Sequence, residues 1–116
     1  MKVTLDHIRR AAEWAIKTGN KPRRIGNKKR AYNQSTWDCG TACCIWGAAC
    51  ILAGKPLGRS GNPLQPRNRS SADWQRLDKE HPEIIGLLGY WMTKPEEVLD
   101  AVKEAMGGEA RKERHA

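Results

Sequence analysis

Cys39 is the side chain of this sequence that could most directly carry out a reaction. It lies in Asp38-Cys39-Gly40, at the start of an apolar stretch that contains all four cysteines. If this stretch is helical, the helix dipole and unpaired N–H groups would lower the thiol pKa and favour the nucleophilic thiolate. Such a nucleophile needs a base, and His81 is the candidate. Because no strand pattern surrounds His81, a structural helix-capping role for Cys39 is favoured over a Cys39–His81 hydrolase or transferase.

The cysteines do not have the spacing of a metal site. On a helix, Cys39 and Cys43 could share a metal, but Cys50 lies about 10 Å beyond Cys43 at 1.5 Å per residue. Tetrahedral zinc holds sulfur ligands at about 2.3 Å, and no second Cys-x-x-Cys or histidine pair is present. We therefore expect no metal and no cofactor, and we expect Cys43, Cys44 and Cys50 to be small buried helix residues.

Positive charge is concentrated in two segments. The net charge is +8; residues 17–30 contain seven Lys or Arg and no acid, and residues 55–69 contain four and no acid. Concentrated charge of this kind attracts polyanions or acidic protein surfaces, although the alternative is a solvated loop that only aids solubility. The candidate binding residues are Arg23, Arg24, Lys28, Lys29, Arg30, Tyr32, Arg59, Arg67 and Arg69.

Cations next to Tyr32 and Trp37 suit phosphate neutralisation combined with base stacking. The sequence contains no helix-turn-helix or RNA-binding signature, so nucleic-acid binding would depend on charge. It would then be salt-sensitive and weakly sequence-specific. The partners that fit are nucleic acid, a nucleoprotein or an acidic protein surface.

Length and composition limit the class of protein. A chain of 116 residues is expected to form one domain. No run of about 18 apolar residues predicts a membrane span, and the first residues lack the apolar core of a signal peptide. We expect a cytoplasmic protein with reduced cysteines.

The pattern of apolar residues predicts an all-α fold, a bundle of four to five helices around a central buried helix, with two long basic loops. The first helix follows a Thr4 N-cap and ends at Gly19-Asn20. Its apolar stripe consists of Leu5, Ile8, Ala12, Ala15 and Ile16. Trp14 lies off this stripe and is expected to pack under a loop. Residues 20–36 are predicted to form one basic loop, with a possible short strand near 30–37.

The remaining helices have clear boundaries. The central helix is capped by Asp38 or Thr41, is apolar on all sides and stops at Gly54. After the second basic loop, a helix from Ser71 is broken at Pro82, unless that proline is the first residue of a new helix. The last helix has a Thr93 N-cap, Pro95 and a Glu at the third position, and it ends at Gly107-Gly108. We expect a domain at 1–108 and a charged flexible tail at 109–116.

One segment resembles a loose group of small phage and bacterial proteins. Their shared motif corresponds here to Trp37, Cys39-Gly40-Thr41, Cys44-Ile45 and Gly47. The resemblance implies a phage or mobile-element setting, hence the host cytoplasm, and no activity. Small phage proteins of this size often bind host machinery, including defence nucleoproteins. Asp38-Cys39-Gly40 is also similar to the nucleophile segment of bacteriocin-processing peptidases. The favoured prediction is a non-enzymatic binding protein, and the alternative is a cysteine hydrolase or transferase.

Overall fold

The structure, a computed structural model, describes residues 2–18, 21–33, 42–54, 72–90 and 92–115, and the side chains of these residues except 42–43 and 108–115. The described chain is mostly helical, as predicted. Its helices are α1 (Leu5–Thr18), α2 (Ile45–Leu52), α4 (Ala72–Glu80), α5 (Pro82–Leu88) and α6 (Pro95–His115).

A small sheet accompanies the helices and corrects the all-α prediction. Its strands are β1 (Arg23–Ile25), β2 (Lys28–Tyr32) and β3 (Ala42–Cys43). They lie in the order β1-β2-β3, with β1 antiparallel and β3 parallel to β2. The short strand that the sequence allowed near 30–37 corresponds in part to β2.

The β1–β2 hairpin replaces most of the loop predicted at 20–36. Ile25 pairs with Lys28 across Gly26 and Asn27. Gly26 has a φ of +59°, and no described residue other than glycine has a positive φ. A glycine at the first central position is the pattern of a type II′ hairpin turn. Ile25 is buried, so it fixes this hairpin to the core. One buried isoleucine among five cations is a weak strand signal, and the charge pattern therefore suggested a loop.

Helix α1 begins and packs largely as predicted. The Thr4 hydroxyl accepts a hydrogen bond from the His7 N–H at 3.4 Å, which confirms Thr4 as the N-cap. Leu5, Ile8, Ala12 and Ala15 are buried, but Ile16 is 42 % exposed, so its place in the stripe was wrong. Trp14 is only 6 % exposed and packs beneath the hairpin, as expected.

Helix α2 is buried as predicted but starts later. Its N-cap is Cys44, whose Sγ accepts the Gly47 N–H at 3.4 Å. Strand β3 occupies the preceding residues and pairs with β2, so the prediction of a helix that begins at Asp38 or Thr41 is wrong. Every residue from Ile45 to Ile51 is buried. Gly54, with a φ of +72°, follows the C-cap, and the predicted end is confirmed.

In the described part of the C-terminal half, the chain forms the helices α4, α5 and α6. Pro82 does not kink a helix but begins α5, and His81 is the N-cap residue between α4 and α5. Helix α6 begins one residue later than predicted, because the Lys94 N–H donates to the Glu97 carboxylate at 2.9 Å. It continues through the predicted stop at Gly107-Gly108 to His115. The strong helix formers that follow the two glycines offset their cost of about 1 kcal/mol each. The segment predicted as a flexible tail is therefore helical through His115.

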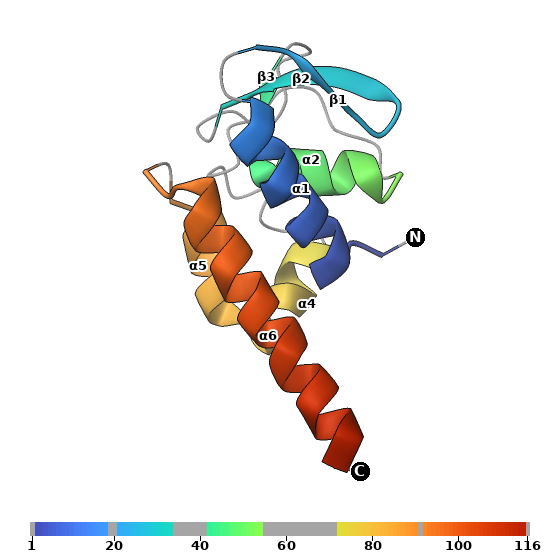
Figure 1. Cartoon of the computed structure of the whole chain (residues 1–116), viewed down its shortest axis with the longest axis vertical. Helices are drawn as coiled ribbons and strands as arrows, with labels where there is room; N and C mark the ends of the chain where they lie inside the picture. Colours follow the sequence, from blue (N-terminus) through green and yellow to red (C-terminus); the bar gives the residue numbers. More distant parts are fainter. Residues whose placement is uncertain (1, 19–20, 34–41, 55–71, 91, 116) are drawn as a thin grey trace.

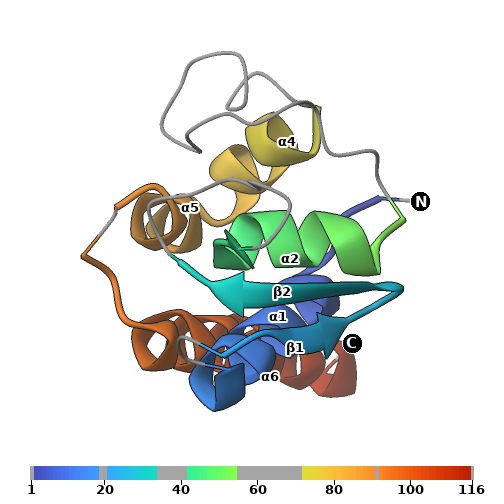
Figure 2. The ribbon, with the colours of Figure 1, turned by 90° about the horizontal axis from the view of Figure 1, so that it is seen from above.

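Helix α1 lies at the centre of the arrangement. It packs against α2 and α6 and contacts both strands of the hairpin. In Figure 1 the sheet lies above α1 and α2, while the C-terminal end of α6 extends beyond the other helices. Seen from above in Figure 2, β1 and β2 run side by side across the top of these helices. Arg23, Arg24, Lys28 and Lys29 on the two hairpin strands are exposed. No described helix has the length and apolar character to cross a bilayer.

Candidate functional site

The hairpin gathers five of the predicted cations onto two paired strands. Arg23 and Arg24 lie on β1, and Lys28, Lys29 and Arg30 lie on β2. The register places Arg23 opposite Arg30 and Arg24 opposite Lys29. Directly opposed like charges destabilise an antiparallel pair. This strand pairing therefore costs electrostatic free energy that opposite-charge pairs at the same positions would avoid.

Alternation along the strands assigns these cations to two faces. Ile25 is buried, which makes its face the inner one, and alternation places Arg23, Lys28 and Arg30 on that same face. Arg24 and Lys29 point to the opposite, outer face, and both are exposed. The outer face therefore carries its two opposed cations in full contact with water.

The exposed hairpin cations have no acidic partner among the described residues. In the described part of the chain, Arg23, Arg24, Lys28 and Lys29 form no ion pair, and Arg24 Nε only donates to the Gly26 carbonyl at 3.2 Å. We call these four exposed side chains, two on each face of the hairpin, the basic hairpin surface. Their positive charge is available to an anion from solution.

Two arginines outside the hairpin, Arg9 and Arg76, are paired with acids. Arg9 contacts Asp6 and Glu13 at 2.6 Å each, and its hydrogen bond holds the pKa of Asp6 below the usual value. Arg76 lies 3.6 Å from Asp73 and 3.8 Å from Glu80. The described residues therefore neutralise some arginines of this surface and leave others, among them the hairpin arginines Arg23 and Arg24, without an ion pair.

Tyr32 anchors the hairpin from below. Its ring meets Trp14 edge to face, with centroids 6.3 Å apart. Burial raises the pKa of the Tyr32 hydroxyl, so the side chain is neutral at ordinary pH. A stacking role for this ring in binding stays a prediction.

A basic cleft lies where α1 meets β1. It has a volume of about 280 Å³ and is lined by Arg10, Glu13, Trp14, Lys17, Arg23 and Arg24. The sequence did not single out Arg10 and Lys17, although their spacing of seven residues places them on one helix face. Arg10 and Lys17 line a cleft with β1 only in the folded structure, so their position beside the strand has no signal in the sequence.

Several predicted site residues cannot be placed. Arg59, Arg67 and Arg69 of the second basic segment lie outside the described residues, and so does Cys39. Of the Cys39–His81 pair, only His81 is described. It lies at the junction of α4 and α5, with Nδ1 3.8 Å from Glu83 Oε1.

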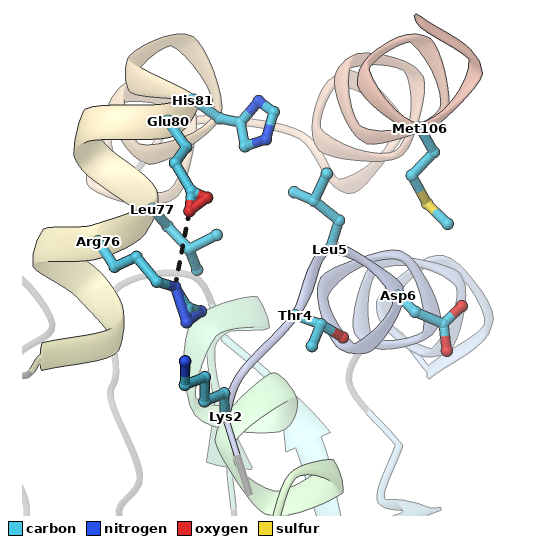
Figure 3. Close-up of a pocket in the computed structure, with 9 residues that line it drawn as sticks. All are labelled: Lys2, Thr4, Leu5, Asp6, Arg76, Leu77, Glu80, His81 and Met106. Atoms are coloured by element: carbon cyan, nitrogen blue, oxygen red, sulfur yellow. Dashed lines mark ion pairs between the residues drawn. The ribbon is translucent and has the colours of Figure 1, made fainter. Parts of the chain in front are cut away.

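His81 borders a pocket of about 440 Å³ between α4 and the start of α1 (Figure 3). Lys2, Arg76 and Glu80 lie around it, and Leu5, Leu77 and Met106 are among its lining residues. No cysteine lines this pocket in the described part of the chain, and Cys44 and Cys50 are buried. Its one hydroxyl, on Thr4, already contacts His7 Nδ1 at 3.1 Å. Among the described residues, this pocket therefore offers His81 no thiol to activate.

Within the described residues, no three His, Cys, Asp or Glu side chains come together as a metal site would require. Comparison of this chain with protein-family models, curated proteins and solved structures finds no significant match.

Proposed function

We propose that this protein is a non-enzymatic nucleic-acid-binding protein that contacts the phosphate backbone through the basic hairpin surface. The observation that carries the proposal is the pairing of two exposed like charges, Arg24 and Lys29, across β1 and β2, with no acid among the described residues to neutralise them. A polyanion bound on the outer face, which carries both side chains, would relieve the repulsion between them. At Arg9 and Arg76, acidic side chains of the protein itself supply the neutralising negative charge.

The chemistry of the surface favours nucleic acid over an acidic protein. Protein interfaces concentrate aromatic and apolar side chains at their centre and are depleted in lysine. Two of the four residues of the basic hairpin surface are lysines, and the exposed large apolar side chains of the described chain, Ile16, Tyr90 and Met92, lie on other elements. Phosphate contacts need only cations, and they carry little sequence information.

The test is the salt dependence of binding. Anisotropy of labelled 25-nucleotide single strands and duplexes would be measured from low to moderate salt. Each neutralised phosphate contributes a slope of about −0.7 to −0.9 in log K against log salt. Lys28→Ala/Lys29→Ala is expected to weaken binding to all sequences alike and to lower the magnitude of the slope by up to about two.

The matched control removes the same charge elsewhere. Lys79 on α4 and Lys103 on α6 are exposed, and Lys79→Ala/Lys103→Ala should bind as the wild type does. If both double variants lose the same binding affinity, the effect arises from net charge and not from the basic hairpin surface. Absence of binding at low salt would rule the function out.

The cysteine hydrolase remains an alternative that no observation in the described residues favours. Alkylation of Cys39 by iodoacetamide below pH 7 would support it, and an inert thiol would end it. The phage setting and a host nucleoprotein as target are likewise proposals, which rest on the motif around Cys39-Gly40-Thr41.

A further inference from the structure

The cleft between α1 and β1 combines four cations with one acid. Arg10 and Lys17 come from the helix, and Arg23 and Arg24 come from the strand. The acid is Glu13, whose Oε1 lies 2.6 Å from Nη1 of Arg9. Because Arg9 compensates the charge of Glu13, the cleft retains a strong positive potential.

The walls of this cleft are fixed to each other. The Trp14 indole N–H donates to the Arg23 carbonyl at 3.3 Å, which ties β1 to α1 beneath the cations. The Thr18 hydroxyl donates to the Trp14 carbonyl at 2.6 Å in a buried position. A ligand would therefore order the ends of the cationic side chains and not the backbone that carries them. This preorganisation reduces the entropy cost of binding.

Arg10 and Lys17 lie on one face of α1, and both line the cleft. Arg10 and Lys17 are two turns apart, about 10 Å along the axis, with Glu13 and Trp14 between them on the same face. Arginines on both walls can donate paired N–H groups to oxygen atoms, the geometry that phosphate accepts best. Among the described residues, Arg10 and Lys17 form no ion pair that would compete with such a ligand.

We infer that this cleft is a discrete phosphate-binding subsite, which seats one phosphate group of a polynucleotide next to the basic hairpin surface. The inference rests on the proposed function and deepens it. The shared chemistry is a phosphate group, either an internal diester or a terminal monoester.

Two variants with opposite expected effects test the subsite. Arg10→Ala/Lys17→Ala should weaken oligonucleotide binding about tenfold or more. It should lower the magnitude of the salt slope by about one and not two, because both cations serve one phosphate. Glu13→Gln removes the acid from the cleft and should tighten binding a fewfold. Glu104→Gln on α6 changes net charge equally and should have no effect.

The two phosphate sources are separated with a 5′-phosphorylated and a 5′-hydroxyl oligonucleotide of the same sequence. Tighter binding of the phosphorylated strand, lost in Arg10→Ala/Lys17→Ala, supports the subsite with a terminal phosphate. Equal binding of the two strands, with both weakened in that variant, supports it with an internal phosphate.

Failure of the subsite is distinguishable from failure of the function. Lys28 and Lys29 do not line the cleft. If Lys28→Ala/Lys29→Ala weakens binding while the Arg10/Lys17 and Glu13 variants bind as the wild type does, the subsite is wrong and the function stands. If no variant changes binding, both are wrong. The gain expected for Glu13→Gln cannot arise from misfolding.

Discussion

At the scale of single residues, Thr4 and His7 form a capping box in which histidine takes the usual place of glutamate or glutamine. The Thr4 N–H donates to His7 Nδ1 at 3.0 Å, and the His7 N–H donates to the Thr4 hydroxyl at 3.4 Å. Nδ1 can accept this bond only when it carries no proton. The hydrogen bonds at the start of α1 therefore depend on a neutral His7 imidazole.

We predict that the free energy of unfolding falls as the pH drops below about 6.5, the ordinary histidine pKa. Burial, and then the charge of Arg10, lower the pKa of His7 in the folded protein. The unfolded chain thus takes up the proton first, so the stabilisation is complete above the unfolded pKa and is lost as pH decreases toward the folded one. Urea midpoints between pH 7.5 and 5 measure the effect.

His7→Gln is the control for this pH dependence. Glutamine keeps a side-chain acceptor for the Thr4 N–H but does not titrate. Its urea midpoint should vary less between pH 7.5 and 5 than that of the wild type. Parallel pH profiles for the two proteins would show that another group is responsible.

At the scale of elements, the hairpin depends on one backbone position. Gly26 has a positive φ, and a Cβ built there would lie 3.1 Å from Ile51 Cγ2 of α2. We predict that Gly26→Ala destabilises the protein by about 1–3 kcal/mol, because alanine would be strained at this φ and would crowd Ile51. Denaturant unfolding measures this loss.

Gly54→Ala is the matched control for the turn. Gly54 also has a positive φ, but nothing lies within 4 Å of a Cβ built there. It should share the backbone strain without the contact. A larger loss for Gly54→Ala than for Gly26→Ala would contradict close packing of the turn on α2.

The same elements show how far the sequence carries a prediction. Thr4, Pro82 and Gly54 are local signals, and the helix boundaries that they mark are right or nearly so. The start of α2 depends on the pairing of β3 with β2 across nine intervening residues, which no local pattern encodes. The sequence predicted the hairpin cations as binding residues but did not predict the cleft. Arg10 and Arg23 line the same cleft only because β1 packs on α1 in the folded protein.

At the scale of the whole molecule, the segment before α1 is clamped to α4. The Val3 N–H donates to Asp73 Oδ1 at 3.3 Å, and Arg76 Nη2 donates to the Val3 carbonyl. Val3 is completely buried. Trp46 and Trp74 meet edge to face at 5.0 Å and join α2 to α4. These contacts connect the two halves of the described chain.

We predict that Asp73→Ala costs about 1–3 kcal/mol of unfolding free energy, because it leaves the buried Val3 N–H without its acceptor. Asp73→Asn keeps an acceptor oxygen and should recover most of the loss. Thermal or urea unfolding of the two variants makes the comparison. Equal stability of Asp73→Ala and the wild type would mean that the clamp contributes nothing.

The opposed cations of the hairpin couple folding to the ionic surroundings. Dissolved salt screens the repulsion between Arg24 and Lys29, and a bound polyanion cancels it by direct contact. Small ions and the polyanion are therefore both stabilisers of β1 and β2, yet they compete for the same charges. Higher ionic strength should therefore stabilise the β1–β2 hairpin and at the same time weaken its binding to a polyanion.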